Sequence, residues 1–347
     1  MYSSYDASSV VSASAAAKTI GAAAVATKGT ANKVELITSY EEGKSVFGED
    51  ASGVYGMSTL LKFLFANGAG AVKAVAVGKD ESEEKDYASA FAALSDEEDV
   101  GVMVCDSAAQ SVHLLLKTAA EDASAARRER IAVIGGSEET VAQMVNRAKA
   151  VNSERVVLVG PDIASDDGGT MSAVFAAAAV AGAIACGADP AVPLNGAELY
   201  GIGGLQSVCS DNDIDLLVQG GVTPLEDVGG VVSPVRGITT RTKTGSAADS
   251  TWRELTTVLI ADDVIPAVRS ALRSKFARAK NTAQGRGAIR AQTIVELEKK
   301  KDAQIIESYG EVAVTAAADD PTVCLVEFSF AVAHGLNQIR LTVHLTV

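Results

Sequence analysis

Cysteine, histidine and aromatic side chains are scarce in this chain, and their scarcity narrows the chemistry it can perform. The 347 residues include three histidines, four cysteines and 5% aromatic residues. The cysteines form no CxxC pair and no other spacing typical of a metal site, and they are Cys105, Cys186, Cys209 and Cys324. We therefore expect no metal site, and we interpret the cysteines as reduced, mostly buried thiols.

Long hydrophobic runs and excess positive charge are also absent. The longest apolar run, residues 171–186, consists mostly of alanine and is shorter than the ~20 residues that span a bilayer. It predicts a tightly packed buried helix, and we expect no membrane insertion. The formal net charge of -14 argues against a general nucleic-acid-binding protein, because attraction to phosphates requires a positive surface.

No motif for nucleophilic catalysis or for binding phosphate is complete. Asp106 and Ser107 shortly precede His113, but a catalytic triad needs a geometry that this spacing does not imply. His334 and His344 have no such neighbours. No GxSxG or P-loop motif occurs, and the glycines of residues 68–70 and 201–203 lack the third glycine of a dinucleotide-binding motif.

The acidic residues 211–215 resemble the first half of a calcium-binding loop. Leu216 replaces the required glycine and Val222 replaces the closing glutamate, so we interpret this segment as a solvated acidic turn. We expect no catalytic residue, metal or cofactor. The alternative is an α/β enzyme of unknown substrate, with a site near Asp106–Ser107 or Pro161–Asp162.

Between residues 53 and 161, helical patterns alternate with short Val/Ile runs. Unbroken apolar runs are typical of parallel strands that are buried on both faces. The predicted strands are residues 72–77, 100–104, 131–134 and 156–159, and Ser137 is expected to cap a helix over residues 138–151. The fold class is α/β, with a layered middle domain at residues 53–225 and a mostly parallel sheet.

The region after residue 187 has a different pattern. Residues 187–250 predict loops and hairpins, with strand signals at residues 216–219 and 231–240. Asp262 or Asp263 is expected to cap a helix with Pro266 in its first turn, and a second helix is expected over residues 286–301. Alternating apolar residues then predict antiparallel strands at 326–333 and 339–347. We expect an α+β domain at residues 226–335 and a terminal arm strand at 336–347.

The C-terminal part also carries a distinct charge. Residues 262–347 have 11 Lys/Arg and 10 Asp/Glu, whereas residues 1–261 have 19 and 34. Between residues 264 and 295 there are seven basic residues and no acidic one, and five of them are Arg269, Arg273, Lys275, Arg278 and Lys280. This stretch is interpreted either as an ordinary solvated helix face or as a contact surface for an acidic protein. No aromatic residue is interleaved as nucleic-acid binding would favour.

Several segments together resemble the contractile-tail sheath family. They are TSYEEGKSVFGE (38–49), LLKFLFANGAGAVKAVAVG (60–78), WRELTTVLIADDVIPAVRSALRSKF (252–276) and VEFSFAVAHGLNQIRLTVHLTV (326–347). The chain is short for that family, which often carries added outer domains. The resemblance implies a structural subunit that polymerises around an inner tube and contracts to drive it through a cell envelope. A two-chain type VI secretion-like sheath component is a further alternative.

The resemblance also implies partners and a location. The partners would be other copies of the chain in stacked rings, the inner tube protein, and baseplate and tail terminator proteins, in a virion tail or tail-like particle assembled in the bacterial cytoplasm. An N-terminal arm (1–20) and the C-terminal arm strand would exchange between subunits, and strands in 21–52 would join the C-terminal domain. The basic helix would face the tube. The arm residues are Val10, Val11, Ile339, Leu341, Val343, Leu345 and Val347.

Overall fold

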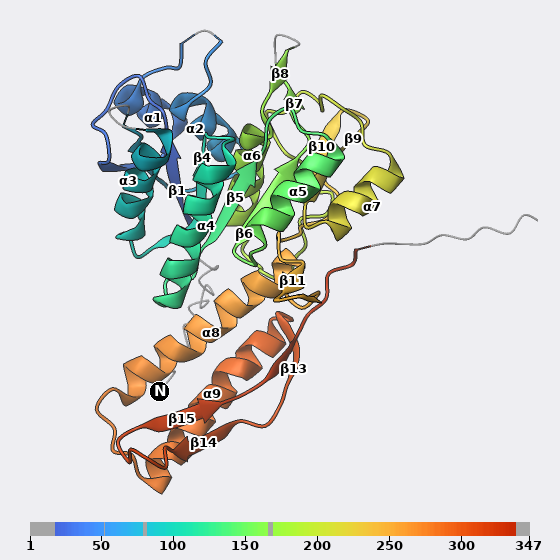
Figure 1. The fold of residues 1–347 in the computed structure, drawn as a ribbon. Coiled ribbons are helices and arrows are strands. Elements are labelled where there is room, and N and C mark those ends of the chain that lie inside the picture. The colour runs from blue at the N-terminus through green and yellow to red at the C-terminus, as the bar shows by residue number, and fades with distance from the viewer. Residues whose placement is uncertain (1–17, 52, 79–81, 166–168, 338–347) are drawn as a thin grey trace, which may run out of the picture.

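A central eight-stranded sheet organises the larger part of the molecule (Figure 1). The computed structural model describes residues 18–51, 53–78, 82–165 and 169–337. The strand order is β10-β9-β6-β5-β4-β1-β3-β2, and only the two edge strands, β10 and β2, pair antiparallel. The strands are β1 (Thr19–Ala24), β2 (Val34–Ile37), β3 (Val72–Ala76), β4 (Val100–Cys105), β5 (Ile131–Gly135), β6 (Val156–Gly160), β9 (Thr223–Val228) and β10 (Val231–Pro234).

Helices cover both faces of this sheet, as the unbroken apolar strands require. One core contains residues of α1 (Tyr40–Phe47), α2 (Met57–Ala66) and α6 (Ala173–Cys186). The opposite core contains residues of α3 (Glu83–Ser95), α4 (Gln110–Ala125), α5 (Val141–Val151) and α7 (Asp211–Gln219). Every residue of β5 and β6 is buried, so the predicted α/β class and mostly parallel sheet are confirmed.

Small side chains bring the sheet and α6 into close contact. A Cβ added to Gly135 in β5 would lie 2.2 Å from the backbone carbon of Ala173, the first residue of α6. Within α6 all but two residues are buried, and the helix begins after Ser172, whose hydroxyl accepts a hydrogen bond from the Val174 N–H. The expected buried, Ala-rich helix is therefore present. No helix of the described residues is long and apolar enough to cross a membrane.

The two N-terminal strands belong to the central sheet, which corrects the prediction that strands in 21–52 join the C-terminal domain. β1 lies between β3 and β4, and β2 forms the edge beside β3. β1 is an unbroken run of small and apolar residues, and five of its six residues are buried. Such a strand is stable in the interior of a sheet that is covered on both faces. The expected boundary at residue 226 is also wrong, because it falls within β9 of the same sheet.

Several predicted helix boundaries were wrong because residues typical of a helix start occur elsewhere. Thr140, and not Ser137, caps α5 and forms a capping box with Gln143. Residues 211–219 form α7 in place of the expected acidic turn and strand, and Ser210 caps this helix. The helix expected to begin near Asp262 is α8 (Leu255–Phe276), so Pro266 lies inside it.

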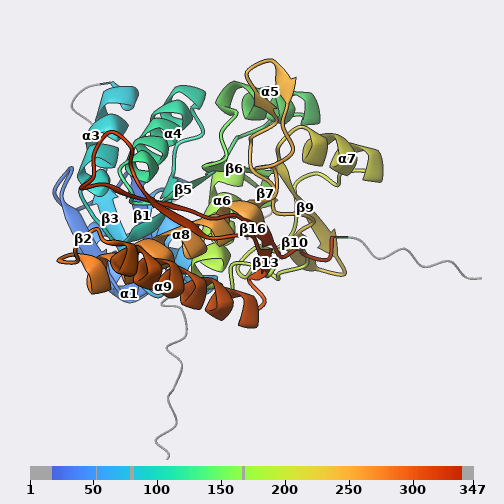
Figure 2. The ribbon, with the colours of Figure 1, turned by 90° about the horizontal axis from the view of Figure 1, so that it is seen from below.

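The C-terminal part packs two helices against two small antiparallel sheets (Figures 1 and 2). α8 contacts α9 (Ala283–Asp302), and apolar residues such as Val264, Val268 and Leu297 form a third core. β13 (Ile306–Tyr309) pairs with β16 (Phe330–Val332), and β14 (Ala313–Ala316) with β15 (Cys324–Glu327). The strand expected over 326–333 is therefore divided between two sheets. The remaining short strands are β7 (Ile163–Ala164), β8 (Thr170–Met171), β11 (Lys243–Thr244) and β12 (Ala247–Ala248).

Candidate functional site

The basic residues of the α8 region divide into two groups. Arg269 is ion-paired with Glu129 of the larger part of the molecule, with 2.8 Å between Nη2 and Oε1. Lys275 Nζ donates to Gln292 Oε1 of α9 at 2.7 Å. The side chains of Arg273, Arg278 and Lys280 are exposed and have no hydrogen bond or ion pair to any residue the structure describes. These three therefore remain available for an external partner.

Ion pairs attach the buried half of α8 to the rest of the chain. Arg155, just before β6, donates through Nη1 to both carboxylate oxygens of Asp262 at 2.8 and 2.6 Å. Burial raises the pKa of Asp262, and the neighbouring Arg155 opposes this rise. Asp263 accepts from Lys300 of α9 at 2.5 Å. The two adjacent carboxylates thus connect α8 to the sheet on one side and to α9 on the other.

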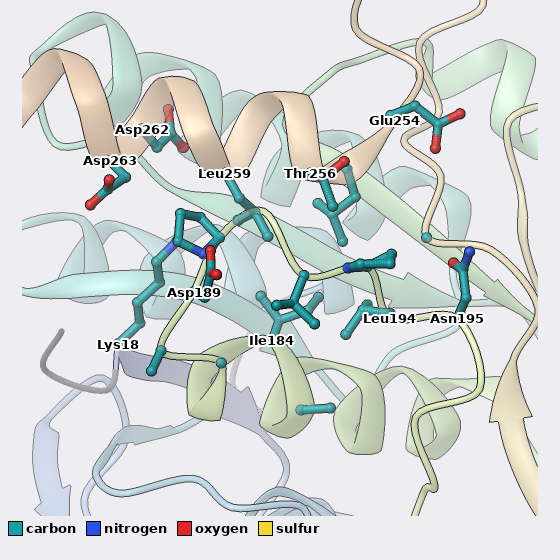
Figure 3. Close-up of a pocket in the computed structure, with 18 residues that line it drawn as sticks. Lys18, Ile184, Asp189, Leu194, Asn195, Glu254, Thr256, Leu259, Asp262 and Asp263 are labelled. Atoms are coloured by element: carbon teal, nitrogen blue, oxygen red, sulfur yellow. The ribbon is translucent and has the colours of Figure 1, made fainter. Parts of the chain in front are cut away.

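A cavity of about 170 Å³ lies beside this junction, between α8 and the end of α6 (Figure 3). Its apolar lining includes Ile184 of α6, Leu194 of the following loop, and Leu255 and Leu259 of α8. Lys18 lies at its edge with Asp189 and Asp263, as Figure 3 shows. Burial lowers the pKa of Lys18, and the charges of Asp262 and Asp263 act in the opposite direction. The cavity is therefore an apolar space with charged groups at its edge.

Both ends of the described chain approach the loop of residues 187–196, which lines this cavity. The Lys18 N–H donates to the carbonyl of Ala185 at 3.1 Å, immediately before the loop. At the other end, Asn195 Nδ2 donates to Asn337 Oδ1 at 2.9 Å. The segments 1–17 and 338–347 thus attach near a common loop. All seven predicted arm residues (Val10, Val11, Ile339, Leu341, Val343, Leu345 and Val347) lie outside the described residues.

The C-terminal sheets have features that the sequence did not predict. β13 and β14 lie in segments for which no strand was expected, and each has one partner strand in the described chain. β13, β14, β15 and β16 therefore all present a backbone edge without a strand beside it among the described residues. Such edges can pair with a strand from another chain. The one signal for β14 was the short apolar run before the Asp319–Asp320 turn.

The carboxylates of the alternative enzyme site hold backbone groups of the protein itself. Asp106, at the carboxyl end of β4, accepts hydrogen bonds from the Val25 N–H at 2.9 Å and from the Tyr87 hydroxyl. Asp162 accepts from the Ala173 N–H at 2.7 Å and from the Glu138 N–H at 2.6 Å. These contacts fasten β1 to β4 and the start of α6 to the loop after β5, so both carboxylates have structural roles.

The neighbouring Ser107 and His113 do not form a nucleophile–base pair. The Ser107 hydroxyl donates to Glu83 Oε1 at 2.6 Å, and His113 Nε2 lies 2.8 Å from the Ser107 carbonyl oxygen. Because a carbonyl only accepts, Nε2 carries the proton and Nδ1 accepts from Arg147 Nη1 at 3.1 Å. The imidazole is therefore oriented away from the hydroxyl that it would need to activate. No group of three side chains able to hold a metal ion occurs among the described residues.

The shifted pKa values of Asp106 and His113 predict two opposite effects of pH on the free energy of unfolding. Burial raises the pKa of Asp106 to about 6, so stability from Asp106 is present below pH ~4 and is lost as the pH rises through 6. Burial lowers the pKa of His113 to about 4, so stability from His113 is lost as the pH falls from ~6.5 to 4. The two contributions are similar in size and opposite in sign.

We therefore expect Asp106→Asn to unmask the histidine contribution. Between pH 6.5 and 4.5 the variant should lose about 2 kcal/mol more unfolding free energy than the original chain. Urea unfolding at both pH values, followed by circular dichroism, measures this difference. Glu84→Gln on the exposed side of α3 serves as the control for removing one carboxylate. An equal pH dependence in the Asp106→Asn variant and the original chain would contradict the prediction.

Comparison with known proteins places this arrangement in a family context. Residues 80–240 match the model of the phage tail sheath protein central domain, and residues 247–346 match that of the phage tail sheath C-terminal domain. The tail sheath protein of Bacillus phage SP01 is 29% identical over 225 residues, which are 63% of this chain and 38% of that protein. The chain thus matches about two fifths of the length of this relative.

Solved structures share the fold over nearly the whole chain. The sheath tail protein from Desulfitobacterium hafniense has 12% sequence identity and a TM-score of 0.72, with 96% of this chain and 100% of that chain covered. The helical sheath of the anti-feeding prophage in its contracted state has 14% identity and a TM-score of 0.71, with 99% and 98% covered. At these identities the likeness concerns the fold.

Proposed function

Because the chain belongs to the phage tail sheath family, we propose that it is the subunit of a contractile sheath, which polymerises around an inner tube and drives this tube through the envelope of a target cell. The observation that carries the proposal is the match of one chain to both the central and the C-terminal sheath domains. A type VI secretion-like sheath divides its parts between two chains, and the single chain here favours the phage-type arrangement.

A structural role agrees with the contacts around the former enzyme candidates. Asp106 and Asp162 bind backbone N–H groups of the fold, and His113 lies against a carbonyl oxygen. A hydrolytic mechanism would require a base in contact with a nucleophile. We propose a non-enzymatic protein of a virion tail or tail-like particle, assembled in the bacterial cytoplasm from sheath, tube, baseplate and terminator proteins. It would function without a cofactor.

The proposed assembly uses strand exchange between copies. A sheath is an open helical polymer, so its subunits join through heterologous contacts that do not close. The strands β13, β14, β15 and β16 each have an edge without a partner in the described chain. The alternating arm at 336–347 could add to such an edge in a neighbour by β-augmentation. The expected arm limit at residue 20 falls within β1 (Thr19–Ala24), so the N-terminal segment proposed to exchange ends before β1. The C-terminal arm is proposed at 336–347.

The energies involved are sufficient for such an exchange. Each apolar arm residue contributes roughly 1.5–3 kcal/mol when fully buried. Each added backbone hydrogen bond contributes about 1 kcal/mol net. The gross gain, on the order of 10 kcal/mol, can offset an association cost of about 4–15 kcal/mol. Exchanged arms would then keep subunits joined while the sheath rearranges.

Electron microscopy of the purified chain tests the proposal. We expect the full chain to form hollow cylinders or rings, and a chain lacking residues 336–347 to remain monomeric. A sharper pair of variants uses the alternation of this segment: Leu341→Asp with Val343→Asp on the apolar face, and Thr342→Asp with Thr346→Asp on the polar face. The first should abolish assembly and the second should preserve most of it.

Two results would count against this proposal. Assembly that survives both the deletion and the apolar-face variant would contradict the arm mechanism while leaving the sheath function in place. A full chain that stays monomeric at high concentration, even with tube and baseplate present, would contradict the sheath function itself.

A further inference from the structure

The cavity beneath α8 combines an apolar lining with one buried polar atom that has no hydrogen-bond partner among the described residues. Ile184, Leu194, Leu255 and Leu259 provide an apolar lining, while Val192 at its edge is 61% exposed. Asn195 also lines the cavity, and its buried Oδ1 atom accepts no hydrogen bond from any described residue. A buried acceptor without a donor is destabilising, so a bound group that supplies an N–H would be favoured.

The chain segment that precedes Lys18 is the candidate occupant of the cavity. Lys18 lines its edge, and its backbone is fixed by the bond from its N–H to the carbonyl of Ala185. The segment 1–17 therefore attaches at the mouth of the cavity. It consists mainly of serine and alanine, and its only branched aliphatic residues are Val10 and Val11. Val11 is seven positions before Lys18, which corresponds to about 23 Å of extended chain, ample to fold back into the adjacent space.

We propose that the cavity binds the N-terminal segment of its own chain, with Val10 and Val11 against the apolar lining and a backbone N–H donated to Asn195 Oδ1. Valine side chains suit a small aliphatic space, and the peptide backbone supplies the missing donor. A segment tethered at the mouth has an effective concentration in the millimolar range, which favours it over the same segment of another copy.

This docking would protect the arm before assembly, a consequence that rests on the proposed sheath function. While Val10 and Val11 lie in the cavity, the N-terminal arm is withheld from open strand edges of other subunits. The cavity is formed by α8 together with α6 and its following loop. A shift of α8 relative to the sheet would alter the cavity and release the arm. The docking itself concerns the single subunit and is tested there.

Disulfide trapping in the monomer tests the docking. In a Cys186→Ser background, which removes the exposed cysteine nearest the cavity, Val11→Cys is combined with Val192→Cys. The matched control combines Val11→Cys with Val228→Cys, which is similarly exposed (65%). Val228 lies at the carboxyl end of β9, whereas Lys18 precedes the amino end of β1, and the two strands run parallel in the sheet. We expect the first pair to form an intrachain disulfide at least about tenfold faster, at a rate independent of protein concentration.

Hydrogen exchange provides a second measurement that needs no cysteine. Val10→Asp with Val11→Asp should accelerate amide exchange in residues 187–196 about fivefold, and Ser9→Asp with Ser12→Asp should leave it unchanged. Equal disulfide rates for the two cysteine pairs, or equal exchange in the two aspartate variants, would overturn the proposal. A trapping rate that rises with concentration would overturn it in favour of a segment from a second copy. Because all readings are taken on monomers, failure of sheath assembly does not affect them.

Discussion

Arg155→Ala is expected to lower the free energy of unfolding by about 3–5 kcal/mol at pH 7, because it removes the guanidinium that bonds both oxygens of the buried Asp262 carboxylate. Only 18% of the Arg155 side chain and 8% of the Asp262 side chain are exposed, so the pair is largely shielded from water. Urea unfolding followed by fluorescence measures the effect. The single tryptophan, Trp252, lies just before α8 and packs against the core beside it.

A double variant separates the buried charge from the loss of packing. Arg155→Met with Asp262→Leu removes both charges and keeps apolar volume, so we expect it to recover most of the lost stability. Lys33→Ala is a suitable comparison, because the Lys33–Glu35 pair has side chains that are 61% and 35% exposed. A loss below about 1 kcal/mol for Arg155→Ala would show that the pair behaves like an exposed ion pair. The loss should also shrink in acid, where Asp262 becomes protonated.

Reversing the free charges at the end of α8 is expected to remove extended sheath from tubes. The variant Arg273→Glu, Arg278→Glu, Lys280→Glu changes three exposed side chains that have no partner among the described residues. Each exposed ion pair contributes about 0.2–1 kcal/mol. Losing three of them should weaken the affinity of each subunit for the tube by roughly a factor of ten or more. Since every subunit of the polymer carries the change, the effect on the whole sheath is much larger.

Negative-stain electron microscopy of sheath mixed with purified inner tubes measures this effect. Extended sheath on tubes should fall at least about tenfold, while tube-free contracted sheath remains abundant. The control reverses Lys28, Lys149 and Lys243, which are exposed residues outside α8 and α9, and gives the same change in net charge. Extended sheath at the original level would refute the tube-facing assignment. Arg269 and Lys275, which contact Glu129 and Gln292, are kept unchanged to preserve the fold.

Local patterns predicted the elements well where one physical requirement dominated. The unbroken apolar runs of β5 and β6 predicted strands that are buried on both faces. The alanine-rich run of α6 likewise predicted a buried helix. The start of α8 was misplaced because Asp262, Asp263 and Pro266 are all typical of a first helical turn. In the structure Asp262 and Asp263 are instead used for contacts with Arg155 and Lys300.

Features that depend on distant residues were not predictable from local patterns. The position of β1 between β3 and β4 depends on pairing with strands that lie far along the chain. The cavity beneath α8 is lined by residues from Lys18 to Asp263, and no segment of the sequence contains a signal for it. The basic stretch was recognisable, but only the structure separates Arg269, which is already ion-paired, from the free Arg273.

The central place of β1 has a consequence for synthesis on the ribosome. Among the strands of the central sheet β1 is made before all others, so neither of its neighbours, β3 and β4, exists when it emerges. The α6 helix that covers it follows much later still. At translation rates of about 5–20 residues per second, β1 must wait for several seconds or more. Its residues Gly21, Ala22, Ala23 and Ala24 expose little apolar area during that interval, so a strand built from small side chains protects the nascent chain from aggregation.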